Sequence, residues 1–532
     1  MKKSLLYLFI LLTFGLILVG CQDKEADSET KESVDMNEEG LPIVDEKVTL
    51  NFVSPKAPLA PDYNEMEIVQ QLEEDTNVHI EWDNIPGEGY QEKKNLMLAS
   101  GDLPDAFYDA QFTDHDIVTY GQNGTLIPLE DLIKEHAPNL QKVLEKRPGI
   151  KSMITAPDGH IYTLPRAEEM GLVRTPNFAS INKTWLDNLG LEMPTTLEEY
   201  HDVLVAFKNE DPNGNGKQDE IPLSFMYEFW TGNFSNFFSN FGVPDQPDDH
   251  RYVEDGKVKY APAQEGWKEA ISYFHGWVEE GLIDEESFTQ DSKAYFAKGK
   301  TEDETLGSYI WWETEEVVGP ERADDYAILP VLENLDGEKF IGPSNLSEYG
   351  RAAFAITKAN PHPEVTMRWV DQLYEPYMSA QVSWGPIGTI YEKDENGMLV
   401  NKELPEDVAM GELRQKVAPG GPIVVLEEDF GTVVDMEPRA KQRLKDIQDY
   451  YEPYLGEEKY PQIFFSPEEL EQINQIEVNI KEFVKQKKAQ WLLNGGIEEE
   501  WDEYKATLEQ MGLPKLMEIY QNGLERFNEN KK

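Results

Sequence analysis

Apolar residues alternate with polar ones, or recur at helical spacing, in short stretches that follow one another from residue 47 onward. Residues 47–53 alternate and predict a strand, while residues 62–75 place apolar side chains on one helical face. Residues 77–82 predict a second strand, 89–100 a second helix and 105–108 a third, short strand. This regular exchange of strand and helix predicts a parallel α/β sheet.

A parallel sheet of this kind binds ligands beyond the carboxyl ends of its strands. Tyr108 and Asp109 stand at the end of the third predicted strand, and residues 82–84 at the end of the second. We therefore expect Tyr108 and Asp109 to lie at a ligand crevice.

The rest of the chain continues both patterns. Strands are expected at 306–312, 326–330 and 351–357. Thr196 followed by Glu198 and Glu199 is typical of a helix start. Helices are expected at 184–189, 196–208, 266–281, 363–374 and 467–493, and as a pair within 498–528.

The first 21 residues have the pattern of a secretion signal. Lys2 and Lys3 precede an apolar run, and Cys21 follows directly after Gly20. Residues 18–21 resemble the lipobox of a bacterial lipoprotein, which implies a signal peptide at 1–20, cleavage before Cys21 and a lipid on its sulfur. The alternative is an uncleaved anchor, but the run is shorter than the ~20 residues of a spanning helix.

Residues 21–46 carry acidic residues and no apolar periodicity, so they predict a disordered tether between lipid and body. The whole chain has 102 Asp and Glu against 48 Lys and Arg, a net charge of −54. Such a surface repels phosphate backbones, so we expect no nucleic-acid partner. It also disfavours anionic lipid, which leaves the acyl chain to hold the protein at the outer face of the cell membrane.

The 532 residues exceed what one core holds, so we expect two to four domains. The single cysteine is the lipidation candidate, so no disulfide is expected. The stability must then come from a large core, for which the chain supplies 11 Trp, 24 Tyr and 23 Phe.

Residues 211–220 resemble the start of an EF-hand calcium loop. Oxygen ligands stand at alternate positions, and Gly216 occupies the sixth position, where the chain must turn sharply. Pro222 stands where the closing Glu is usual. The alternative is a plain Asn-Gly turn. A structural calcium ion would be held by Asp211, Asn213, Asn215, the carbonyl of Lys217, Asp219 and Glu220.

Aromatic residues occur beside acids and amides in several stretches after this loop. Flat rings cover the apolar faces of a sugar, while carboxylate, amide and guanidinium groups bind its hydroxyls. The alternative for each ring is a place in the core. The candidate ligand contacts are Trp230, Trp312, Trp311, Trp384, Tyr108, Asp109, Tyr349 and Arg351.

Five stretches together resemble one family, the solute-binding lipoproteins of ABC importers that carry oligosaccharides. They are residues 100–105, 182–190, 193–200, 384–388 and 501–520. Alginate-binding members of this family are also similar in the calcium loop. The resemblance implies a monomeric, two-lobed α/β fold of the type II periplasmic-binding-protein kind, with mainly parallel sheets flanked by helices. A ligand would bind between the lobes and pass to the transmembrane permease.

The same resemblance implies how the chain divides between the lobes. Lobe 1 would hold residues 47–175 plus 335–395, and lobe 2 residues 176–334 plus 396–532. Crossovers would lie near 172–181, 332–349 and 390–404.

No sequence motif of an enzyme stands out. The chain has no Gly-x-Ser-x-Gly elbow, zinc-binding His-Glu-x-x-His, P-loop or dinucleotide fingerprint. The many Asp and Glu residues single out no glycosidase pair. We therefore expect a binding protein, with a polysaccharide-degrading glycosidase or lyase and a peptide receptor as the alternatives.

Overall fold

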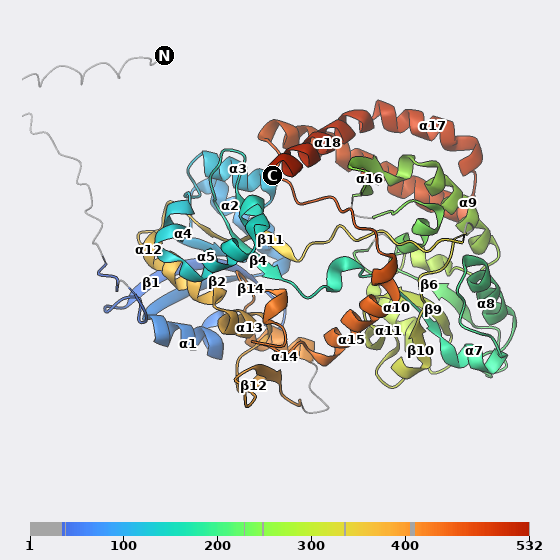
Figure 1. Cartoon of the computed structure of the whole chain (residues 1–532), viewed down its shortest axis with the longest axis horizontal. Coiled ribbons are helices and arrows are strands. Elements are labelled where there is room, and N and C mark those ends of the chain that lie inside the picture. The colour runs from blue at the N-terminus through green and yellow to red at the C-terminus, as the bar shows by residue number, and fades with distance from the viewer. Residues whose placement is uncertain are drawn as a thin grey trace, which may run out of the picture.

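The protein consists of two α/β lobes that lie side by side, as the computed structural model in Figure 1 shows. The structure describes residues 34–37, 39–227, 229–246, 249–334, 337–404 and 410–530. The predicted signal peptide and Cys21 lie outside these residues. The predicted two-lobed α/β fold is confirmed.

The first lobe has a six-stranded sheet in the order β14-β4-β11-β3-β1-β2. Its helices flank both faces, and a hairpin of β12 and β13 packs beside it. The strands are β1 (Val48–Lys56), β2 (Val78–Pro86), β3 (Ala106–Tyr108), β4 (Leu164–Glu168), β11 (Tyr349–Ile356), β12 (Tyr391–Lys393), β13 (Leu399–Asn401) and β14 (Val424–Val425). The helices are α1 (Glu67–Thr76), α2 (Gly87–Ser100), α3 (Asp114–Gln122), α4 (Glu130–His136), α5 (Pro138–Lys146), α6 (Pro148–Ile154), α12 (Pro363–Asp371), α13 (Pro376–Trp384) and α14 (Met410–Val417).

The second lobe has a four-stranded sheet in the order β10-β5-β9-β6 and a separate β7-β8 hairpin. The strands are β5 (Phe178–Asn182), β6 (Ile221–Ser224), β7 (Arg251–Glu254), β8 (Lys257–Tyr260), β9 (Leu306–Trp311) and β10 (Tyr326–Ile328). The helices are α7 (Lys183–Leu189), α8 (Leu197–Asn209), α9 (Glu265–Glu279), α10 (Ser292–Gly299), α11 (Thr314–Val318), α15 (Pro438–Asp446), α16 (Pro467–Asn494), α17 (Ile497–Gln510) and α18 (Leu513–Asn530).

The sheets are mixed, where mainly parallel ones were expected. In the first sheet β1 pairs with β2 and β3 in parallel, but β11 runs antiparallel to both β3 and β4. In the second sheet only β6 and β9 are parallel. The antiparallel strand β11 returns to the first lobe after the chain has built most of the second, so no crossover helix sets its direction.

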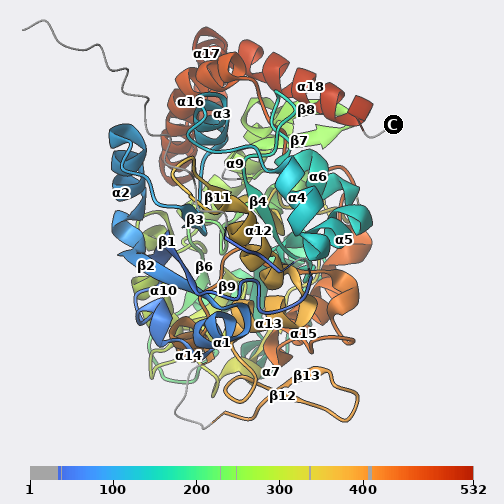
Figure 2. The ribbon, with the colours of Figure 1, turned by 90° about the vertical axis from the view of Figure 1, so that its left-hand side faces the viewer.

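The alternation of residues along β1 explains why both faces of the first sheet are covered. Leu50 and Phe52 belong to one apolar core, while Val53 points into a second core on the opposite face. In the second lobe, one core extends from Ala179 in β5 to Leu524 in α18. The C-terminal helices α16–α18 therefore belong to the second lobe, and Figure 2 shows α16 beside α3 of the first.

Two expected boundaries differ from the structure. Residues 396–532 were assigned to lobe 2, but Val424 of β14 pairs with Ala167 of β4 in the first sheet. The expected crossover at 390–404 is instead the β12-β13 hairpin, where Tyr391 and Leu399 pack with Val425. The chain first adds β14 to the edge of the first sheet, and only then crosses to the second lobe for the last time.

The expected tether at 21–46 also ends earlier than predicted. Ile43 and Val44 are fully buried in the core of the first lobe, and Met36 forms a bridge with Val44. Arg368 of α12 donates hydrogen bonds to the carbonyl oxygens of Asn37 and Gly40. Two buried apolar residues thus fix the chain to the body before β1 begins. Among the described residues, no helix is both long and apolar enough to cross a membrane.

Candidate functional site

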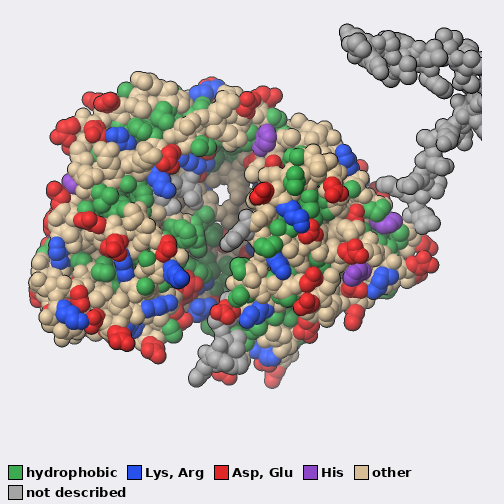
Figure 3. Space-filling view, turned by 180° about the vertical axis from the view of Figure 1, so that it is seen from behind, with side chains coloured by type: hydrophobic (Ala, Val, Ile, Leu, Met, Phe, Trp, Pro, Cys, Tyr) green, Lys and Arg blue, Asp and Glu red, His purple; other side chains and the backbone are tan. Residues whose placement is uncertain are grey.

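A cavity of about 600 Å³ lies between the two lobes and is lined by both. Figure 3 shows the molecule hollowed at this place, seen from behind. The first lobe contributes Arg166, Glu168, Tyr349, Trp384, Tyr391 and Arg414. The second lobe contributes Phe178, Trp230, Trp312 and Glu316, and helix α15 adds Arg439 and Arg443.

Aromatic rings stand on both walls of this cavity. Trp230 is 43% exposed, and its ring centre lies 5.9 Å from that of Trp312 with the planes tilted by 49°. On the first lobe, Trp384 lies 5.9 Å from Phe430. Rings that remain open to solvent in a cavity of this size provide flat apolar surfaces for a ligand.

The charged groups near these rings form ion pairs with one another. Arg166 Nη2 lies 2.9 Å from Glu168 Oε2, and Ser383 also donates to Glu168. Arg443 pairs with Glu313, whose carboxyl has a raised pKa because it is buried, although Arg443 opposes the shift. Pairing keeps the ionic groups in place, and guanidinium and carboxylate groups of this kind bind hydroxyls through charge-assisted hydrogen bonds.

Trp230, Trp312, Trp384 and Tyr349, all predicted ligand contacts, lie together at this cavity. The hydroxyl of Tyr349 donates a 2.5 Å hydrogen bond to Glu169 Oε1, which fixes its ring at the edge of the site. We keep these four residues as the candidate contacts.

The other four predicted contacts are absent from the residues that line the cavity. Tyr108 is 1% exposed and donates to the carbonyl of Gly420, which covers the end of β3. Asp109 accepts from Gln111 outside the cavity, and Trp311 is 4% exposed within a core cluster. Arg351 is 9% exposed, pairs with Asp114 at 3.3 Å and lies over the ring of Phe464.

Several lining residues were missed because their local sequence is ordinary. Arg439 and Arg443 belong to α15, a short charged helix that resembles a solvated surface helix. Glu316 and Arg414 stand among many other charged residues. One sequence signal does indicate this part of the site: Glu313 and Glu316 follow Trp312 closely, and acids beside aromatics are typical of sugar sites.

The expected calcium loop folds back on itself through its side-chain oxygens. Asp211 Oδ2 accepts from Gly216 N at 3.0 Å, Asn213 Oδ1 from Asn215 N at 3.0 Å, and Asn215 Oδ1 from Lys217 N at 2.7 Å. Gly216 has a φ of 74°, in the left-handed region that glycine adopts readily. The three oxygens thus turn toward the backbone of their own loop.

Glu220 provides the test of whether this loop suits a cation. Both its carboxylate oxygens are buried, and neither has a hydrogen-bond partner among the described residues. Burial raises the pKa of Glu220, and the neighbouring Asp219 and Asp211 raise it further. A cation would compensate this buried carboxylate, so the residues fit one. The described residues contain no cluster of three or more His, Cys, Asp or Glu side chains at metal-binding distance, so amide and carbonyl oxygens must complete the set.

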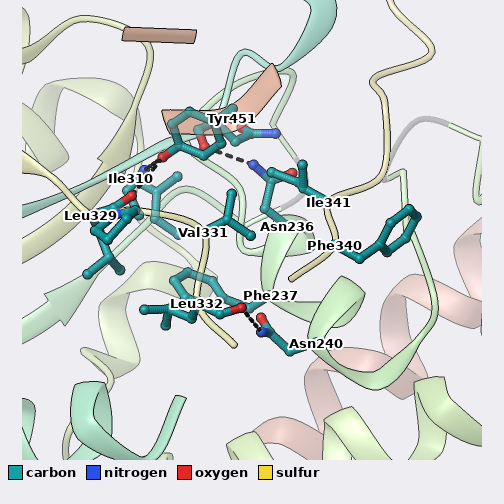
Figure 4. A pocket seen from close by; sticks show the side chains of 13 residues that line it. Asn236, Phe237, Asn240, Ile310, Leu329, Val331, Leu332, Phe340, Ile341 and Tyr451 are labelled. Carbon is teal, nitrogen blue, oxygen red and sulfur yellow. Dashed lines mark hydrogen bonds between the residues drawn. The ribbon is translucent and has the colours of Figure 1, made fainter. Parts of the chain in front are cut away.

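A much smaller cavity of about 30 Å³ lies inside the second lobe, where the connections from the first lobe enter (Figure 4). Tyr451 donates to the carbonyl of Leu329, and Asn240 to that of Leu332. The volume suits a water or two, and the lining is mostly apolar. We therefore assign this cavity to the packing of the connections and not to ligand binding.

Comparison with known proteins agrees with a two-lobed binding protein. The model of the bacterial extracellular solute-binding protein family matches residues 56–376. The chain is 40% identical, over 98% of both chains, to the fructooligosaccharide ABC transporter substrate-binding protein FusA of Streptococcus pneumoniae serotype 4.

Solved structures show the same similarity. FusA in complex with kestose superposes with a TM-score of 0.83 at 40% identity, covering 91% of this chain and 100% of that chain. A FusA EF-hand mutant in complex with fructo-nystose superposes with a TM-score of 0.82 at 39% identity and the same coverage. The alginate-binding protein AlgQ2, at 21% identity and a TM-score of 0.70 over 92% of this chain and 100% of that chain, shares the fold.

Proposed function

We propose that this chain, which belongs to the bacterial extracellular solute-binding protein family, captures an oligosaccharide between its lobes for an ABC importer. The observation that carries the proposal is the cavity of about 600 Å³, with Trp230 and Trp312 on one wall and Trp384 on the other. The similarity to FusA extends over nearly the whole chain and therefore over both walls.

The substrate class that we propose is fructooligosaccharide. FusA carries that description, and its structures hold kestose and fructo-nystose. The paired charges Arg166–Glu168 and Arg443–Glu313 suit a neutral, hydroxyl-rich ligand, because each charge is already balanced. Hydroxyl groups add hydrogen bonds to such pairs without leaving a buried charge unpaired.

Capture would couple to closure of the lobes. A ligand that contacts residues of both lobes gains its full set of interactions only when they approach each other. Binding then shifts the population toward the closed form, as in hinge closure around a ligand. The bound sugar leaves unchanged, so the protein acts without catalysis.

The location follows from the N-terminal sequence. A lipid on Cys21 would hold the protein at the outer face of the membrane, within reach of the permease subunits that receive the sugar. The described body begins near Val34, so residues 21–33 are what separates it from the lipid.

We also propose that the loop at residues 211–220 holds a structural calcium ion. The buried carboxylate of Glu220 supports the assignment, as does the EF-hand mutant made in FusA. The ion would be bound by Asp211, Asn213, Asn215, the carbonyl of Lys217, Asp219 and Glu220. It would supply charge compensation and a rigid loop before β6.

Isothermal titration calorimetry with kestose, nystose, maltotriose and a short peptide tests the function. We expect binding of the two fructooligosaccharides and at least tenfold weaker binding after Trp230→Ala. Leu96→Ala should change nothing, because Leu96 is an exposed side chain of α2 that does not line the cavity. Binding of the peptide alone would refute the sugar assignment. Release of reducing ends or unsaturated products from a polysaccharide would instead indicate an enzyme.

A further inference from the structure

Two pairs of aromatic side chains from separate parts of the second lobe meet beside the cavity. Phe229 stacks on Trp311 with ring centres 5.9 Å apart and planes 7° apart. Trp230 lies next to Trp312, also at 5.9 Å, and both of these line the cavity. We call these four residues the aromatic platform, with Phe229 and Trp311 supporting the two rings that face the ligand.

One carboxylate holds both indoles that come from β9 and its end. Glu316 Oε2 accepts a hydrogen bond from Trp311 Nε1 at 2.9 Å and from Trp312 Nε1 at 3.0 Å. Glu316 belongs to α11, which begins two residues after Trp312. Neither indole can rotate without breaking a hydrogen bond to a charged acceptor, which is stronger than a neutral one.

Trp312 is held on one face as well as at its edge. The guanidinium carbon of Arg443 lies 4.4 Å from the centre of its ring, in the geometry of a cation–π contact. Arg443 is itself fixed by its ion pair with Glu313, which is 8% exposed. One face of Trp312 is therefore covered by Arg443 of α15, while the ring still lines the cavity.

We infer that Glu316 is a positioning residue for sugar recognition, which acts by setting the orientation of Trp312 before the ligand arrives; this inference rests on the proposed function. A side chain that is already ordered loses no rotamer freedom when a sugar ring stacks on it. Ordering one such side chain on binding weakens affinity by about twofold to tenfold. Glu316 orders two indoles in advance, so this loss of affinity is avoided.

Two substitutions separate this role from a general effect on folding. Glu316→Leu removes the acceptor, and Glu316→Gln keeps a neutral one. We expect about tenfold weaker kestose binding for Glu316→Leu, a smaller loss for Glu316→Gln, and a reduced tryptophan signal in near-ultraviolet circular dichroism without sugar. The far-ultraviolet spectrum stays unchanged. Glu321→Gln, which removes an exposed carboxylate just after α11, is the matched control and retains the affinity of the parent protein.

A double-mutant cycle with Trp312→Phe distinguishes positioning from direct contact with sugar. Phenylalanine keeps a ring but has no N–H, so Glu316→Leu should weaken binding by less than about threefold in that background. An undiminished tenfold loss there would overturn the inference, as would an unchanged near-ultraviolet spectrum in Glu316→Leu. If the parent protein binds no oligosaccharide, the proposed function fails, while the spectrum still decides whether Glu316 orients the indoles.

Discussion

Asp245 is a fully buried carboxylate that connects three parts of the second lobe. Its Oδ2 lies 3.1 Å from Lys488 Nζ on α16 and accepts from Trp267 Nε1 on α9 at 3.1 Å. Its Oδ1 lies 2.7 Å from His250 Nδ1. The side chains of Asp245, Lys488 and His250 are 0%, 5% and 1% exposed. We predict that Asp245→Asn destabilises the lobe strongly although it changes neither size nor shape.

The magnitude follows from the charge that the substitution leaves behind. Removing one partner of a buried ion pair costs about 3–5 kcal/mol. The ring of Phe238 lies 4.9 Å from Lys488 Nζ, and this cation–π contact still stabilises the ammonium group in the variant. We therefore expect a loss at the lower end of this range, about 3 kcal/mol. For a domain of this size that corresponds to a fall of about 6–12 °C in the melting temperature.

Calorimetry and urea unfolding at pH 7, followed by tryptophan fluorescence, measure this loss. Asp449→Asn is the control, because Asp449 forms an exposed i,i+4 pair with Lys445 that is worth under about 1 kcal/mol. Asp245→Asn combined with Lys488→Met should recover part of the stability, since the ammonium group that loses its carboxylate partner is then removed as well. A loss below about 1 kcal/mol for Asp245→Asn, or no recovery in the double variant, would refute the reasoning.

The same carboxylate predicts a dependence on pH. Burial acts to raise the pKa of Asp245, but Lys488 and His250 outweigh it and hold the pKa well below its usual range. A carboxyl with a lowered pKa in the folded state contributes stability above its ordinary pKa and loses it as the pH falls. The difference in unfolding free energy between the parent protein and Asp245→Asn should therefore shrink as the pH falls below roughly pH 4.

Three further predictions concern the cation, the lobes and one helix. A chelator should lower the melting temperature of the parent protein but not that of Asp211→Ala; an unchanged parent would contradict the calcium assignment. Kestose should reduce the radius of gyration in small-angle X-ray scattering, and an equal radius with and without sugar would argue against closure. Thr196→Ala removes the capping box that Thr196 forms with Glu199 at the start of α8, and should cost about 1 kcal/mol in urea unfolding. A change below about 0.3 kcal/mol would show that the cap contributes little.

The helices with local start signals were predictable nearly to the residue. Residues 196–208 and 467–493 were expected as helices, and α8 covers Leu197–Asn209 while α16 covers Pro467–Asn494. Both begin with a capping box, in which Thr196 or Ser466 caps the backbone and a Glu three residues later reciprocates. Such signals lie within four residues of sequence, so no tertiary information is needed to find them.

Tyr108 shows why the ligand contacts were harder to predict. It does stand at the end of a strand of the first sheet, but the turn at Gly420 and Gly421 packs over its ring. A Cβ on Gly421 would lie 2.3 Å from that ring, so only glycine permits this approach. Nothing near Tyr108 in the sequence indicates that a segment some three hundred residues away will cover it.

The alternation of side chains along a strand bears on Trp311 and Trp312, which were both expected to contact ligand. Successive side chains of a strand leave on opposite faces, so two neighbouring tryptophans at a strand end are expected in different surroundings, even though both indole N–H groups here reach Glu316. Trp311 enters the core and Trp312 lines the site. The alternation alone would have predicted that only one of the pair contacts ligand, although not which one.

The cores of both lobes draw on distant parts of the chain, and this limits what an incomplete protein can do. The core of the second lobe requires Trp491, Trp501 and Leu524, which come long after Arg443, the last residue that lines the cavity. A chain that ends between Arg443 and α18 has every lining side chain but lacks the helices that close the core. Early termination should therefore yield unfolded fragments that proteases remove, not half-built receptors that occupy an importer without delivering sugar.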